Sequence, residues 1–143
     1  MNELREAALK YAQEFGWRIL PVDGKKPLIK SWPEAATTNP EEIKAWWHEW
    51  PEANVGVLTG EGLFVIDVDG KEGEASLGLL GPLPPTLECR TARGRHLYFL
   101  GDGPNTTGKL GPGLDTRGKG GFVVAPPSVH KETGVIYRWV EDA

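Results

Sequence analysis

The sequence contains a single cysteine, Cys89, among its 143 residues. One cysteine excludes an internal disulfide and a cysteine-based zinc site. No apolar run approaches the length of a membrane span. The first ten residues carry charges throughout, unlike a secretory signal peptide. We therefore expect a soluble intracellular protein with no membrane partner.

Positive charge is also in short supply, because the formal net charge is -4. Attraction to phosphate supplies most non-specific nucleic-acid affinity, so this sum argues against a nucleic-acid partner. Its distribution matters more, since residues 86–120 contain only the acids Glu88, Asp102 and Asp115. A local basic surface is therefore compatible with the acidic total. The basic residues of this stretch are Arg90, Arg93, Arg95, Lys109, Arg117 and Lys119.

The 19 glycines and 12 prolines predict many turns and short elements. Residues 2–15 and 39–50 have the caps and apolar periodicity of helices, and 74–80 can form a shorter one. The runs 55–58 and 63–68 predict a hairpin through the turn at 59–62. This order favours an α+β fold with a largely antiparallel sheet. Other strands are expected at 17–22, 87–91, 96–100, 114–116, 122–125 and 136–140, with a glycine-rich loop at 101–113.

An apolar run that ends in two aspartates is the most informative stretch, at residues 64–70. In a strand, Phe64, Ile66 and Val68 would face the core. Asp67 and Asp69 would project from the other face, about 7 Å apart at Cα. Such carboxylates repel unless a cation lies between them, which is how Mg²⁺ is held. The stretch alone is equally compatible with a plain strand that enters an Asp-Gly turn.

Two other sites built on such aspartates do not fit. A calcium loop of the EF-hand type needs an oxygen ligand, a glycine and a glutamate where this chain has Lys71, Glu72 and Gly78. A phosphatase of the haloacid dehalogenase type needs Thr or Ser at the position of Lys71. The chain also lacks room for the parallel βαβ units of such an enzyme.

Two later stretches add groups that suit phosphate chemistry. His96 begins an apolar strand after Gly94, whose backbone can approach a phosphate closely. Taken alone, His96 is better explained as an edge histidine with a local hydrogen bond. Asp115 lies in a short strand, and Arg117 and Lys119 follow in an expected flexible glycine loop. Together, three carboxylates, a histidine and loop cations suit metal-assisted phosphoryl transfer.

In this order, the three stretches resemble the motifs of the bifunctional DNA primase/polymerase (prim-pol) domain of the archaeo-eukaryotic primase superfamily. The first motif corresponds to Asp67-Val68-Asp69, and the second to Gly94-Arg95-His96 before the aromatic pair Tyr98 and Phe99. The third runs from Asp115 through a glycine loop to Pro126-Pro127-Ser128. The opening also matches, with Gly24-Lys25-Lys26-Pro27 and a Trp-rich helix before Asn54-Val55-Gly56-Val57. The resemblance covers nearly the whole chain.

The resemblance implies an α+β fold in which an RRM-like catalytic half, with a mixed or antiparallel sheet, packs on a smaller αβ half. Residues 1–143 would form one catalytic domain, either a compact core or the N-terminal region of a larger replication protein. Family members are often fused to helicases in plasmid or viral replication proteins. A cytoplasmic protein of a prokaryote, plasmid or virus with a fused or associated helicase is therefore expected.

The resemblance also implies a DNA primase/polymerase that uses dNTPs or NTPs, a single-stranded DNA template and a primer. Asp67, Asp69 and Asp115 would ligate two Mg²⁺ or Mn²⁺ ions. His96 would contact the triphosphate. The residues expected to neutralise phosphate charge are Arg117, Lys119, Arg95 and Lys25. Two alternatives remain open: a metal-dependent phosphohydrolase or nuclease, and a catalytically silent binder of nucleotides or single strands.

Six tryptophans are present, and most are expected to be structural. Trp46, Trp47 and Trp50 share a helix face with Ile43, which favours core packing. Trp32 is expected in a loop, where stacking on a nucleic-acid base is open to it.

Overall fold

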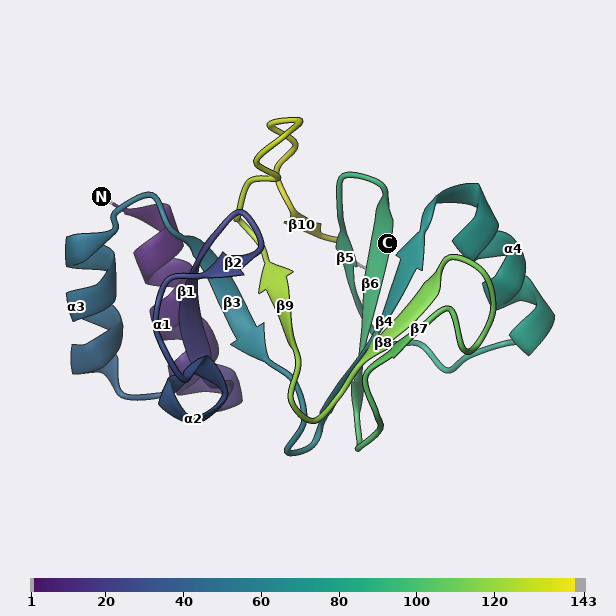
Figure 1. The fold of residues 1–143 in the computed structure, drawn as a ribbon, viewed down its shortest axis with the longest axis horizontal. Coiled ribbons are helices and arrows are strands. Elements are labelled where there is room, and N and C mark those ends of the chain that lie inside the picture. Colours follow the sequence, from purple (N-terminus) through teal and green to yellow (C-terminus); the bar gives the residue numbers. More distant parts are fainter. Residues whose placement is uncertain (1, 141–143) are drawn as a thin grey trace. The chain divides into compact units, whose positions relative to one another are not determined.

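The computed structural model describes residues 2–140, which fold into two compact units. The chain up to Leu58 and the segment Phe122–Tyr137 form the first unit. Thr59–Gly121 and the strand after Tyr137 form the second. Each unit has one sheet, and every strand pair is antiparallel (Figure 1). The expected α+β class is confirmed. Within these residues, no helix is both long and apolar enough to cross a bilayer.

The first unit combines three helices with a four-stranded sheet. Asparagines cap its two long helices, because the side-chain oxygens of Asn2 and Asn39 each accept two backbone N–H groups of the first turn. The sheet order is β2-β1-β3-β9. The helices are α1 (Glu3–Phe15), α2 (Trp32–Ala35) and α3 (Pro40–Glu49). The strands are β1 (Ile19–Asp23), β2 (Lys26–Pro27), β3 (Asn54–Leu58) and β9 (Phe122–Ala125).

The tryptophans of the first unit pack against protein. Trp47 is buried, and its indole N–H donates to the Ala53 carbonyl at 3.0 Å. Trp46 and Trp50 are half-buried. Trp32 lies in α2 rather than in the expected loop, and its ring meets the Phe122 ring edge-on at 5.0 Å between centroids. Local packing therefore accounts for Trp32 without a nucleic-acid base.

The second unit is a six-stranded sheet with α4 (Gly70–Leu80) on one face. The buried cluster Ile66, Val68, Leu77, Leu97 and Leu114 joins this helix to the sheet, with Phe64 and Phe99 packed against it. The expected core face of the aspartate strand is thus confirmed. The sheet order is β10-β5-β6-β4-β8-β7. The strands are β4 (Leu63–Asp69), β5 (Leu87–Arg90), β6 (Gly94–Leu100), β7 (Thr106–Thr107), β8 (Leu114–Arg117) and β10 (Arg138–Trp139).

The hairpin expected from residues 55–58 and 63–68 is wrong. β3 pairs with β1 and β9, whereas β4 pairs with β6 and β8, so both edges of each strand are occupied by other partners. The turn between them closes only one isolated bridge, Gly60 with Leu63. Residues 59–62 do form a tight turn, but long-range pairing places the two strands in different sheets.

Two glycines of α4 should respond in opposite ways to alanine. A Cβ on Gly73 would lie 2.6 Å from the Gly113 carbonyl oxygen, whereas a Cβ on exposed Gly78 meets nothing within 4 Å. We expect Gly78→Ala to stabilise the protein by up to about 1 kcal/mol through helix propensity. Gly73→Ala should destabilise it by about 1–3 kcal/mol through overpacking. Urea denaturation of the pair measures both changes, and equal effects would contradict the packing of α4.

Candidate active site

The pairing of β4 with its two neighbours builds the candidate site. Asp67 lies directly opposite His96 on β6 and directly opposite Asp115 on β8. Directly opposed residues project from the same face of a sheet, and here it is the face opposite α4. Cys89 on β5 and Thr107 on β7 extend this row at its two ends. Residues far apart in the sequence are thereby gathered in one line across the sheet.

Each carboxylate of the row has a cationic or ionisable neighbour. His96 Nε2 lies 3.5 Å from Asp67 Oδ1, and Arg117 Nη2 lies 3.6 Å from Asp115 Oδ2. Asp115 Oδ1 also accepts a hydrogen bond from the Gly108 N–H at 3.0 Å. The side chains of Asp67 and Asp115 are each 29% exposed, against 10% for His96. Solvent and ligands can therefore reach both carboxylates, while the imidazole is held beside them.

Asp69 projects from the same face one pleat further along β4, opposite Gly94. It occupies the cap position of α4, yet its side chain makes no capping hydrogen bond. Its exposed carboxylate is therefore not committed to holding the helix. Unlike Asn2 and Asn39, which cap their helices, Asp69 keeps its oxygens available to a ligand.

Oxygen donors of this kind suit Mg²⁺ or Mn²⁺, which prefer carboxylates. Within residues 2–140, no three His, Cys, Asp or Glu side chains are gathered closely enough to hold a metal ion in the present side-chain positions. Asp67 and Asp115 are directed to His96 and Arg117 instead. The chemistry and register of the three aspartates fit a divalent cation, and the ligand set itself stays a prediction.

The glycine turn after β8 is braced, which corrects the expectation of a flexible loop. Asn105 Oδ1 accepts from the Gly118 N–H at 2.8 Å, and Asn105 Nδ2 donates to the Lys119 carbonyl at 2.9 Å. The Thr59 hydroxyl donates to the Gly118 carbonyl at 2.7 Å. A Cβ on Gly118 would lie 1.7 Å from the Gly103 carbonyl oxygen, so this position needs glycine. The turn presents exposed Lys119 from a defined backbone.

Sequence reasoning did not single out Thr59 or Asn105. Thr59 stands in a segment that the sequence predicts as an ordinary hairpin turn. Asn105 lies in the expected glycine-rich loop at 101–113 and belongs to none of the three motifs. Their role comes from hydrogen bonds to residues distant in the chain, so no local pattern could have predicted it.

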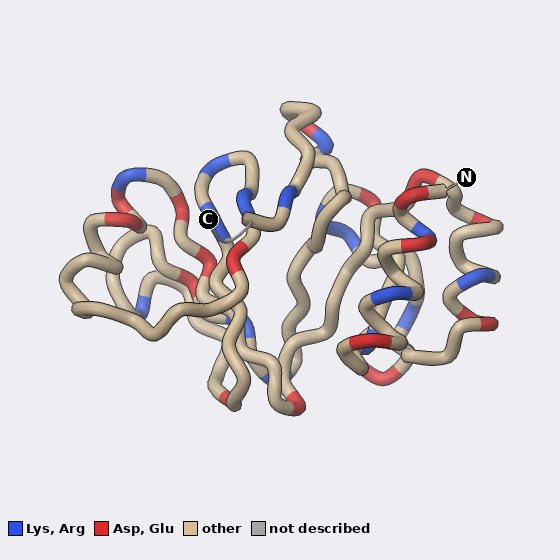
Figure 2. The backbone as a smooth tube through the Cα atoms, turned by 180° about the vertical axis from the view of Figure 1, so that it is seen from behind, with Lys and Arg blue, Asp and Glu red and all other residues tan. Residues whose placement is uncertain are grey.

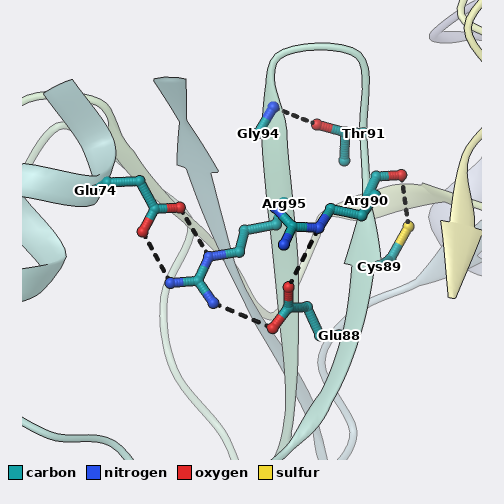
Figure 3. A network of polar contacts seen from close by, with 7 residues as sticks. All are labelled: Glu74, Glu88, Cys89, Arg90, Thr91, Gly94 and Arg95. Atoms are coloured by element: carbon teal, nitrogen blue, oxygen red, sulfur yellow. Dashed lines mark hydrogen bonds and ion pairs between the residues drawn. The ribbon is translucent and has the colours of Figure 1, made fainter. Parts of the chain in front are cut away.

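Arg95 lies on the opposite face of the sheet from His96 and contacts two carboxylates, and its expected role in neutralising phosphate charge stays a prediction. Adjacent residues of a strand point to opposite faces. Two nitrogens of Arg95 contact Glu74 at 2.8 Å, and Nη1 contacts Glu88 at 3.1 Å (Figure 3). Hydrogen bonding to Glu74 raises the pKa of Arg95 above its ordinary value. Arg95 therefore fastens α4 to the sheet.

Two further motif residues lie in the first unit. Lys25 is an exposed residue of the turn between β1 and β2, and its phosphate role stays a prediction. Ser128, in the Pro-Pro-Ser segment, is buried, and its Oγ accepts from the Val55 N–H at 2.8 Å. This motif segment therefore has a structural role in holding β3.

Residues 8–143 match the family model described as bifunctional DNA primase/polymerase, N-terminal. The chain belongs to this prim-pol family. No curated protein matches it in sequence. The match covers almost the whole chain and so includes both units of the prim-pol domain.

Cys89 of the prim-pol domain packs beside His96 at the end of the row. Its side chain is fully buried, and burial raises the pKa of the thiol to about 12, an effect to which the charge of Glu88 adds. A backbone hydrogen bond with Arg138 acts in the opposite direction. Because the thiolate is the nucleophilic form, Cys89 is not a reactive group at neutral pH.

This burial makes stability depend on alkaline pH. The thiol binds its proton more tightly in the folded protein than at the ordinary pKa of 9.0, so its contribution is complete below pH 9 and is lost as the pH rises towards 12. Between pH 8 and pH 10, the wild type should lose roughly 1.4 kcal/mol relative to Cys89→Ala. Urea denaturation of both proteins at the two pH values measures this difference. A constant difference would contradict the buried thiol.

Proposed function

We propose that the second unit of this prim-pol domain performs metal-dependent, template-directed nucleotidyl transfer from a dNTP or NTP to a primer 3′-hydroxyl. The observation that carries the proposal is the register of β4. It aligns Asp67 with Asp115 and His96 on one solvent-accessible face. A plain strand that ends in an Asp-Gly turn gives no reason for a second aspartate and a histidine to stand opposite the first.

In this proposal, Asp67, Asp69 and Asp115 hold two Mg²⁺ or Mn²⁺ ions. When bound, such ions lower the pKa of the attacking hydroxyl and neutralise charge on the triphosphate. The like charges of Asp67 and Asp115 at opposed positions support this role, since a cation removes their repulsion. Asp69 supplies an exposed carboxylate that makes no capping hydrogen bond to α4.

The remaining groups bind and orient the nucleotide. His96 stands beside Asp67 and can donate a hydrogen bond to a phosphate oxygen. Arg117 and Lys119 neutralise phosphate charge from the end of β8 and from the braced turn. Because Asn105 and Thr59 already hold that turn, little backbone freedom is lost when a triphosphate binds. Such preorganisation raises affinity and improves alignment for attack.

Extension of a labelled primer on a single-stranded template, with Mn²⁺ and labelled nucleotides, tests the proposal. Incorporation that follows the template sequence supports nucleotidyl transfer. Release of phosphate without primer extension would instead indicate a phosphohydrolase, and degradation of the primer a nuclease. Binding of the triphosphate without turnover would indicate a silent binding module.

Substitution of the opposed aspartates should separate activity from stability. We expect Asp67→Asn and Asp115→Asn each to reduce incorporation by at least about 100-fold, because each removes a metal ligand. The melting temperature should change little, since the relief of repulsion between the like charges offsets the lost contact with His96 or Arg117. Glu132→Gln is the matched control, because Glu132 is exposed and lies in the first unit.

Both readouts bear on the assignment. Near-normal incorporation by either aspartate variant would contradict the metal-site proposal. A large fall in melting temperature would show that the aspartates hold the sheet together, and lost activity would then follow from unfolding.

The role of His96 can be tested by nucleotide affinity. We expect His96→Ala to weaken triphosphate binding roughly tenfold or more, the effect of one charge-assisted hydrogen bond. Primer-template affinity should change little. Fluorescence titration with a labelled triphosphate and Mn²⁺ measures the first, and anisotropy of labelled DNA the second. His48→Ala is the control, because His48 is an exposed residue of α3. Unchanged nucleotide affinity with lowered stability would assign His96 a structural role only.

A further inference from the structure

Three arginines stand side by side across one edge of the second sheet. Arg138 on β10 is directly opposite Arg90 on β5, which is directly opposite Arg95 on β6. Figure 2 shows Lys and Arg positions gathered along the β5–β6 hairpin and the neighbouring strand β10. Directly opposed like charges destabilise a sheet unless counter-charges offset them. The aligned arginines therefore need negatively charged groups nearby.

The nearby carboxylates neutralise only part of the charge of these arginines. Glu74 and Glu88 both contact Arg95. Glu88 is shared, because its other oxygen lies 3.7 Å from Arg90 Nε (Figure 3). Arg138 and the hairpin residue Arg93 are exposed, and neither forms an ion pair with any of the other residues from 2 to 140. The guanidinium groups of Arg90, Arg93 and Arg138 remain accessible to an anion.

These arginines lie next to the strand end that carries the aspartates. Gly94, at the start of β6, is opposite Asp69, and the Gly70 N–H donates to the Arg93 carbonyl at 2.8 Å. The tip of the hairpin is thus fastened to the end of β4. Arg93 therefore lies beside the end of β4 that carries Asp69.

We propose that Arg90, Arg93 and Arg138, named here the arginine edge, bind the phosphodiester backbone of a DNA strand that enters or leaves the candidate active site. The inference rests on the proposed function and identifies a surface for its nucleic-acid partner. Guanidinium groups match phosphate oxygens through paired N–H donors. Arg90 and Arg138 lie on neighbouring strands about 5 Å apart, and Arg93 lies in the turn that follows the strand of Arg90, so the three guanidinium groups suit successive phosphates of one chain.

A single triphosphate is a poorer occupant of this surface. Arg90 and Arg138 share the α4 face with Arg95, whereas His96 and Asp67 project from the other face. A nucleotide held at His96 therefore stands on the far side of the sheet from these two guanidinium groups. A polymer that passes around the hairpin tip reaches both faces. The arginine edge also concentrates positive charge on a chain of net charge -4.

The salt dependence of DNA binding tests the arginine edge without any catalytic step. The variant is Arg93→Gln/Arg138→Gln, which breaks no ion pair within the described residues. The control is Lys10→Gln/Lys44→Gln, with the same change in charge on exposed positions of α1 and α3. Anisotropy of a labelled oligothymidylate is measured in EDTA from low to moderate salt. Melting temperatures verify that all proteins are folded.

We expect the arginine variant to bind roughly tenfold more weakly at low salt, and the slope of log K against log salt to flatten by about 1.4, or 0.7 for each lost phosphate contact. The control should keep the slope of the wild type. Triphosphate affinity in Mn²⁺ should be unchanged in both. An unchanged slope in the arginine variant overturns the inference, as does a loss of triphosphate affinity alone. If the wild type binds DNA with the expected salt dependence but incorporates no nucleotide, the proposed function is contradicted and the arginine edge is still supported.

Discussion

The pairing register of β4 is the constraint on which the candidate site depends. A shift of one residue would turn Asp67 towards α4 and Ile66 towards solvent, because side chains alternate between the faces of a strand. Burial of Ile66 and Val68 against α4 opposes that shift. The hydrophobic core on one face therefore determines the alignment of Asp67 with His96 and Asp115 on the other. The same strand pairing sets both the packing of the core and the geometry of the candidate site.

Opposed aspartates are a cost to the folded protein, and the structure offsets it locally. Arg117 is next but one to Asp115 on β8, so both project from the same face and their side chains approach to 3.6 Å. His96 approaches Asp67 to 3.5 Å from the neighbouring strand. These contacts stabilise the row in the absence of a cation. The same neighbours suit phosphate binding, so the groups that lower repulsion in the free protein can serve the nucleotide.

Local pattern was sufficient for much of this fold. Alternation in residues 64–68 predicted which side chains face the core, apolar periodicity predicted α1, and an asparagine cap predicted the start of α3. The separation of β3 from β4 could not be predicted, because pairing with β9 depends on residues distant in the chain. The contact of Arg95 with Glu74 could not be predicted for a related reason, since Glu74 lies on α4 and no local signal reveals the pair. The motif resemblance predicted which residues form the site. The strand register that aligns Asp67 with His96 and Asp115 is seen only in the structure.

Thr59, the first residue of the second unit, also shapes the turn that carries Lys119. Leu58 and Phe122 are the last paired residues of β3 and β9, and the next residues continue the ladder with a 2.9 Å hydrogen bond from the Thr59 N–H to the Gly121 carbonyl. The Thr59 hydroxyl then reaches Gly118. One residue thus closes the segment 59–121 at its base and braces the turn within it. Within the second unit, the Thr59 contacts with Gly118 and Gly121 therefore hold the backbone that presents Lys119, a group proposed to bind phosphate.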